Sequence, residues 1–177
     1  GAGARLFVKE GLMEGVGRVY GSHISSQIKS GCVSLTPGPN NASCDHFTIK
    51  VTGKGAHVSK PHLGVDALYT AAQMIVAEQS IVARNTNPLD TVVVGIGLCN
   101  AGTAYNIIAE HAVIEGTTRC FSPETREFTN RRVREIAESV AAANGASVEI
   151  EFEDFAAPLI NDEDAAREVS AIAERII

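Results

Sequence analysis

The 177-residue sequence lacks the features that would place it in a membrane or on a nucleic acid. No apolar run approaches the roughly 20 residues that a membrane-spanning helix needs. Basic residues are few: 15 Lys and Arg stand against 21 Asp and Glu, and the net charge of −6 leaves no basic stripe for docking on phosphates. Hydrophobic residues, at 45%, suffice for a packed core. We therefore expect a globular protein with no nucleic-acid partner and no membrane partner.

Closely spaced cysteine pairs and several common catalytic motifs are absent too. The four cysteines lie far apart, at Cys32, Cys44, Cys99 and Cys120. This spacing argues against a disulfide framework or a zinc finger, and we expect reduced thiols and a cytoplasmic location. No HExxH, GxxxxGK(S/T) or GxSxG motif occurs, so the sequence gives no support to a zincin, a P-loop enzyme or an α/β-hydrolase.

The hydrophobic pattern is clearest between residues 45 and 156. The predicted elements are, in order, a strand at 46–51, a helix at 65–84, strands at 92–98 and 111–121, a helix at 123–143 and a strand at 148–152. The second helix has a start signal, Ser122-Pro123-Glu124, in which the hydroxyl can cap and proline suits the first turn. The order βαββαβ predicts an α+β, ferredoxin-like fold: a four-stranded antiparallel sheet with two helices on one face.

The two flanks are less regular than this central part. Short strand-like runs occur at 18–24 and 31–35, and a dense turn signal follows at 37–41. A further helix begins near Asn161. The chain starts and stops inside helical patterns, so we expect the flanks to be pieces of another unit.

Histidines and two other polar residues are the candidates for chemistry. His57 follows a glycine-rich stretch where backbone could approach a ligand closely, which favours a functional role. Asn106 offers a neutral donor and acceptor, and Arg119 offers a two-pronged donor that matches a carboxylate. Together the three could grip an anionic or carbonyl-containing substrate, although Asn and Arg often only satisfy loop carbonyls. His23 ends a strand-like run, where it could ligate a metal or simply bond to the backbone.

The other three histidines are assigned structural positions. We expect His46 and His111 to face solvent from the polar sides of strands, and His62 to order the loop before the first long helix.

Several sequence motifs follow one another along the chain in the same order as in a known protein family. They are Cys44-Asp-His-Phe-Thr-Ile-Lys-Val-Thr-Gly-Lys-Gly-Ala-His57, Pro61-His-Leu-Gly-Val-Asp66, Ile81-Val-Ala-Arg84, Asn87-Pro-Leu-Asp90, Gly102-Thr-Ala-Tyr-Asn106 and Glu115-Gly-Thr-Thr-Arg119. This set resembles the lid, or dimerisation, domain of M20 metallopeptidases, especially amidohydrolases that cleave N-acyl amino acids, hippurate or indole-acetyl amino acids. Gly21-Ser-His23 falls where that family has a metal-binding histidine.

The resemblance implies a domain organisation and a reaction. Residues 43–156 would be the lid or dimerisation domain, with partial catalytic-domain segments at 1–42 and 157–177. The family hydrolyses amide bonds of N-acyl amino acids or small peptides, using two divalent metal ions, zinc or else manganese, cobalt or nickel. The lid forms a homodimer and sends a histidine to the partner's site.

The resemblance also implies roles for four residues. His57 would be the catalytic residue that polarises the carbonyl and stabilises the oxyanion. Asn106 and Arg119 would bind the substrate, chiefly its carboxylate, and His23 would ligate metal.

The sequence also departs from the family's pattern. The early His-x-Asp or Cys-x-His segment, the Glu-Glu pair and the late histidine ligand are missing. A catalytic zinc usually needs three protein ligands, and a symmetric partner adds only a second copy of His23. We therefore expect a central fragment that dimerises, binds no metal stably and has no hydrolase activity alone. The alternative is a non-enzymatic βαββαβ module for oligomerisation or small-ligand binding.

Overall fold

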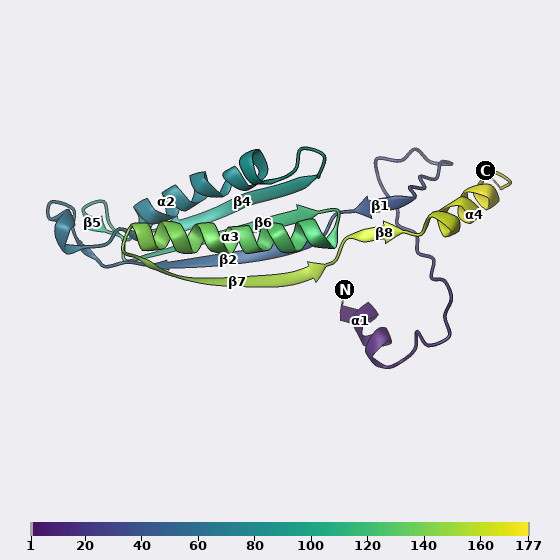
Figure 1. Cartoon of the computed structure of the whole chain (residues 1–177), viewed down its shortest axis with the longest axis horizontal. Helices are drawn as coiled ribbons and strands as arrows, with labels where there is room; N and C mark the ends of the chain where they lie inside the picture. The colour runs from purple at the N-terminus through teal and green to yellow at the C-terminus, as the bar shows by residue number, and fades with distance from the viewer. Residues whose placement is uncertain (1, 177) are drawn as a thin grey trace. The chain divides into compact units, whose positions relative to one another are not determined.

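The computed structural model describes residues 2–176, which divide into two compact units (Figure 1). Residues 42–158 form the central unit, and the segments before residue 42 and after residue 158 form the flanking unit. No helix in the described part of the chain is long and apolar enough to cross a membrane.

Four antiparallel strands form the sheet of the central unit, in the spatial order β4-β6-β2-β7. The strands are β2 (Cys44–Thr52), β4 (Val92–Ala101), β6 (His111–Cys120) and β7 (Ser147–Ala156). β2 pairs with β6 on one side and with β7 on the other, so β4 and β7 are the two edges. The predicted α+β class and the antiparallel pairing are confirmed.

Two helices, α2 (Ala67–Glu78) and α3 (Pro123–Ala143), cover one face of this sheet (Figure 1). α2 lies along β4 and β6, whereas α3 lies along β6 and β7. Alternate side chains of β2 point under the helices, and the most buried large hydrophobic residues of the core are Phe47, Ile49, Val51, Met74, Ile81, Ile114 and Val133. Each buried methylene contributes about 0.8 kcal/mol, so this layer is the main stabilising feature of the unit.

The helix starts depend on capping side chains. The Ser122 hydroxyl accepts the Thr125 N–H at 3.1 Å, and α3 begins at Pro123 as predicted. α2 begins two residues later than expected, because the Asp66 carboxylate accepts the N–H groups of Leu68 and Tyr69. Its predicted continuation is interrupted after Glu78, and a short π-helix, η2 (Ile81–Asn85), follows.

The flanking unit contains α1 (Ala2–Lys9), the two-stranded pair β1 (Gly38–Asn41) and β8 (Leu159–Asn161), and α4 (Glu163–Ala173). The strands predicted at 18–24 and 31–35 are wrong, because a strand needs a hydrogen-bonded neighbour and no described segment pairs with these runs. The turn predicted at 37–41 is instead largely strand β1. α4 begins as expected, since the Asp162 carboxylate accepts the Ala165 N–H at 2.8 Å.

Candidate functional site

His57 lies on a loop whose two ends are joined by backbone hydrogen bonds. The Lys54 N–H donates to the Val65 carbonyl at 2.8 Å, and the Val65 N–H donates back to Lys54 at 2.9 Å. Glycines make this approach possible: a Cβ on Gly53 would lie 2.2 Å from the Val65 carbonyl oxygen, and one on Gly64 would lie 2.8 Å from that of Lys54. Gly53, in the stretch where the sequence suggests close approach to a ligand, therefore admits the loop's own backbone, and Gly64 does the same.

A small ribbon places His57 beside Asn106. Strand β3 (Ala56–His57) pairs with β5 (Ile107–Ile108), and the Val58 N–H donates to the Asn106 carbonyl at 3.1 Å. His57 itself is exposed, with Nδ1 3.1 Å from the Ser59 backbone nitrogen and 2.8 Å from the Ser59 hydroxyl. The structure thus brings two of the predicted site residues together on one hydrogen-bonded ribbon.

Arg119 lies at the opposite end of the sheet. β6 begins at His111, next to the ribbon, and Arg119 comes eight residues later, about 27 Å away at the rise of an extended strand. Its side chain is exposed on the face away from the helices, and it forms no hydrogen bond or ion pair with any described residue. One chain therefore does not assemble His57, Asn106 and Arg119 around a single substrate.

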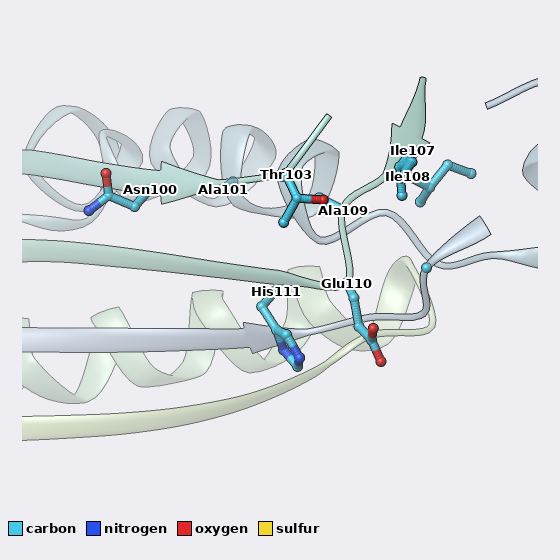
Figure 2. Close-up of a pocket in the computed structure, with 10 residues that line it drawn as sticks. Asn100, Ala101, Thr103, Ile107, Ile108, Ala109, Glu110 and His111 are labelled. Carbon is cyan, nitrogen blue, oxygen red and sulfur yellow. The ribbon is translucent and has the colours of Figure 1, made fainter. Parts of the chain in front are cut away.

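A cavity of about 330 Å³ lies between the end of β4, the β5 strand and the start of β6 (Figure 2). Its polar lining consists of Asn100, Thr103, Glu110 and His111, and Ile107 and Ile108 supply apolar surface. Figure 2 shows the Glu110 and His111 side chains reaching to the same side of the connection between β5 and β6. The volume suits a small molecule or part of one.

The sequence motifs predict little of this cavity. Of its polar lining residues, Thr103 belongs to the motif that ends at Asn106, and His111 is predicted to face solvent; His111 is exposed, but it also lines the cavity. The signal in the sequence is this motif, since it contributes Gly102 and Thr103 to the lining and the other lining residues except Gly55 lie close to it along the chain.

Two other histidines differ from expectation. His46 lies on the polar side of β2, where it is predicted to face solvent, but it is half-buried, and its Nε2 lies 3.1 Å from the Glu115 carboxylate on β6. His62 lies in a short 3₁₀-helix, η1 (Pro61–Leu63), and bonds to no described residue. The Lys54–Val65 bridge, rather than His62, orders the loop.

His23 belongs to the flanking unit and is exposed. Its Nδ1 lies 2.6 Å from the Ile24 carbonyl oxygen, which can only accept, so Nδ1 is the donor and, in the neutral ring, Nε2 carries the lone pair. That tautomer suits metal binding through Nε2. However, no group of three or more His, Cys, Asp or Glu residues in the described part of the chain could hold a metal ion. These residues fit one ligand of a metal centre and do not form a complete one.

A charged cluster near the Arg119 end of the sheet has a structural role. Arg126 of α3 bonds to Asp45 of β2, with Nε 2.7 Å from Oδ2, and to Asp154 of β7 at 2.6 Å. Burial would raise the pKa of Asp45, but hydrogen bonds from Arg126 and Asn130 outweigh it and hold that pKa below its ordinary value. The cluster joins two strands and a helix, and every member is engaged within the fold.

Comparison with known proteins identifies the family. The model of the M20 peptidase dimerisation domain matches residues 43–145. The chain belongs to the M20 family. It is 39% identical over 163 residues to N-acetyl-L-cysteine deacetylase of Bacillus subtilis, a match that covers 92% of this chain and 39% of that protein. The chain thus spans less than half the length of this curated M20 relative.

Solved M20-like structures share the fold. A putative aminohydrolase from methicillin-resistant Staphylococcus aureus matches with a TM-score of 0.91 and 28% identity, over 97% of this chain and 46% of that one. A dinuclear metal-binding peptidase of the M20 family from Bacillus subtilis matches with a TM-score of 0.76 and 29% identity, over 98% of this chain and 43% of that one. The family inferred from the linked motifs is confirmed.

Proposed function

We propose that this chain is the dimerisation and substrate-clamping part of a metal-dependent M20 amidohydrolase. The whole protein would hydrolyse the amide bond of an N-acyl amino acid or small peptide, in line with a relative that is named for deacetylating N-acetyl-L-cysteine. The observation that carries the proposal is the exposed His57, which lies next to Asn106 on a loop whose ends are joined by backbone hydrogen bonds. A scaffold that served only for oligomerisation would not need an exposed imidazole on so constrained a support.

His57 is the proposed catalytic residue. As water adds to the amide carbonyl, the oxygen gains negative charge, and an imidazole N–H placed near it stabilises that charge. Asn106 offers an amide beside it for orienting the substrate, and Arg119 offers a free guanidinium for its carboxylate. Two divalent metal ions, zinc or else manganese, cobalt or nickel, would activate the water in the whole enzyme. His23 is the only one of their ligands that we assign to this chain.

The separation of about 27 Å between His111 and Arg119 along β6 implies that each site uses two subunits. If His57 and Asn106 of one chain act with an arginine, that arginine must be the partner subunit's Arg119. Pairing between the β4 edges of two chains satisfies this requirement. β4 begins opposite Arg119 and ends beside the His57 loop, and antiparallel pairing across a two-fold axis brings the end of one β4 to the beginning of the other.

The chemistry of the edges favours β4 over β7. β4 is ten residues long and carries no charge, with Val93 and Leu98 exposed at 49% and 41%. The neighbouring α2 exposes further apolar side chains, with Val76 at 74%. β7 carries Glu149, Glu151, Glu153 and Asp154, which would oppose like charges in a symmetric pair. We therefore place the homodimer interface along β4 and α2.

Two finer assignments accompany this proposal. We infer a ferredoxin-like topology for the lid from its strand order and its two helices on one face. We also place the protein in the cytoplasm, because its four cysteines are free.

Mixing two inactive variants of the whole enzyme tests the shared site. His57→Ala and Arg119→Ala subunits, coexpressed, form heterodimers in which one site has both wild-type groups and the other has neither. Random pairing makes half of the dimers mixed, so activity should recover to about a quarter of the wild-type value. Steady-state hydrolysis of an N-acetyl amino acid measures it.

The matched control pairs two variants from the same end. His57→Ala with Asn106→Ala leaves a defect in both sites of every dimer, so no recovery is expected. If the first mixture shows no more activity than the average of its two parents, the shared site is wrong.

A further inference from the structure

The loop that carries His57 also contains a residue with no role in the proposed function, Ser59. The His57 carbonyl accepts the Lys60 N–H at 2.8 Å, which folds residues 57–60 into a tight turn. This turn brings both polar groups of Ser59 to the His57 ring. The backbone nitrogen lies 3.1 Å from Nδ1, and the hydroxyl oxygen lies 2.8 Å from it.

The backbone contact identifies which ring nitrogen carries the proton, and the hydroxyl adds a second donor to the same nitrogen. A backbone N–H can only donate, so Nδ1 of His57 must present its lone pair. The neutral ring then has its proton on Nε2, and the Ser59 hydroxyl, facing the same lone pair, also donates. His23 shows the opposite arrangement, because its Nδ1 donates to a carbonyl and leaves the lone pair on Nε2.

We propose that Ser59 is a positioning residue that holds the His57 imidazole with its proton on Nε2 and that N–H directed outward. The inference rests on the proposed function only for the use of the N–H, which is to stabilise the developing oxyanion. A histidine with the other tautomer would present a lone pair to the same oxygen and would repel it. Ser59 thus acts on the reaction through His57, without touching the substrate.

The tautomer can be measured in this chain without any assay of activity. Long-range proton–nitrogen correlation spectra of the ¹⁵N-histidine-labelled protein, recorded at about pH 8.5 where an ordinary imidazole is neutral, separate protonated from unprotonated ring nitrogens. We expect His57 to show a protonated Nε2 and an unprotonated Nδ1. His62 is the internal control, since it lies in the same loop without a hydrogen-bond partner among the described residues and should show averaged shifts.

Two variants separate the hydroxyl from general effects on the loop. Ser59→Ala removes one of the two donors and should move the two His57 nitrogen shifts toward those of His62, whereas Ser59→Thr should restore the wild-type pattern. Backbone amide shifts outside residues 54–65 should stay unchanged in both. The proposal is wrong if wild-type His57 resembles His62, or if Ser59→Ala leaves its ring shifts unchanged.

Kinetics in the whole enzyme separate this inference from the proposed function. Ser59→Ala should lower kcat about tenfold with KM nearly unchanged, and Ser59→Thr should recover most of the loss. If the spectra are as expected but His57→Ala retains full kcat, the catalytic role of His57 fails while the control of its tautomer by Ser59 stands. If His57→Ala is inactive and Ser59→Ala is fully active, the positioning role fails alone.

Discussion

At the scale of single residues, Glu78 is a buried carboxyl group in the central unit that lacks, within the described chain, the hydrogen bonds such a group normally needs. It lies on the stripe of α2 that packs against α3, it is fully buried, and neither carboxylate oxygen has a hydrogen-bond partner among the described residues. Burial raises its pKa to about 8, and Arg132 on α3 offsets this only in part. The folded protein therefore holds Glu78 protonated at neutral pH, whereas the unfolded chain ionises it near its ordinary pKa of 4.5.

Stability should consequently fall as pH rises through this window. Below pH 4.5 the carboxyl is neutral in both states and costs least. Between pH 4.5 and about 8 only the unfolded chain releases the proton, which favours unfolding by about 4 to 5 kcal/mol in total. Glu78→Leu should remove this slope and raise the free energy of unfolding by at least about 2 kcal/mol at pH 8. Urea unfolding at pH 5 and pH 8 measures both effects.

Glu138→Gln is the matched control, because Glu138 is an exposed carboxylate on α3. It should leave the difference between the two pH values close to that of the wild type. An equal slope in Glu78→Leu and wild type would contradict the assignment.

At the scale of elements, the loop of residues 54–65 depends on two glycines that no helix or strand pattern required. Gly53 lets the Val65 carbonyl approach where a side chain would stand, and the obstacle is backbone, which cannot rotate away. The conformation of the loop is therefore tied to the ends of β2 and α2. This explains how a loop with little regular structure can hold His57 firmly.

Gly53→Ala should break the Lys54–Val65 pair. We expect a loss of about 1 to 3 kcal/mol in the free energy of unfolding, as for other overpacked sites, and faster proteolysis within residues 54–65. Gly55→Ala is the control, since its new Cβ would meet nothing closer than the Glu110 side chain at 3.6 Å. Comparable losses in the two variants would show that backbone approach at Gly53 is not the cause.

At the scale of the whole molecule, the proposed dimer can be tested through its edges. Leu98→Glu on β4 and Val76→Glu on α2 each place a charge in the proposed interface and should raise the dimer dissociation constant roughly tenfold or more, about 1.4 kcal/mol. Phe155→Glu adds the same charge on β7, where Phe155 is 53% exposed, and should leave the dimer intact. Sedimentation velocity over a range of concentrations measures all three. If only Phe155→Glu dissociates the dimer, the interface lies along β7 and not along β4.

The hydrolase activity of the chain is also a property of the whole molecule. We expect this chain alone to show no turnover of hippurate or N-acetyl amino acids, with or without added zinc, because the structure offers one of the proposed metal ligands, His23. A colorimetric assay of the free amine that hydrolysis releases measures this turnover. Metal-dependent turnover that a chelator abolishes would show that the chain holds a complete centre.

Much of the central unit could be predicted because its signals are local. The alternation from Phe47 to Val51 and the cap at Ser122 depend on residues within a few positions of one another, and both appear as expected. The run at 18–24 has a similar strand-like pattern but forms no strand, because a strand also needs a partner. Local pattern therefore predicted an element reliably only where the described chain also supplied its neighbour.

The sequence by itself determined the family, the α+β class and the identity of the residues available for chemistry. Only the tertiary structure decided which of them meet: strand pairing joins His57 to Asn106 and separates both from Arg119 by the length of β6. Packing of α2 on α3 likewise decided that Glu78 is buried. The reason is physical, since spacing along a chain sets local conformation, whereas proximity and burial arise from contacts between segments that are distant in sequence.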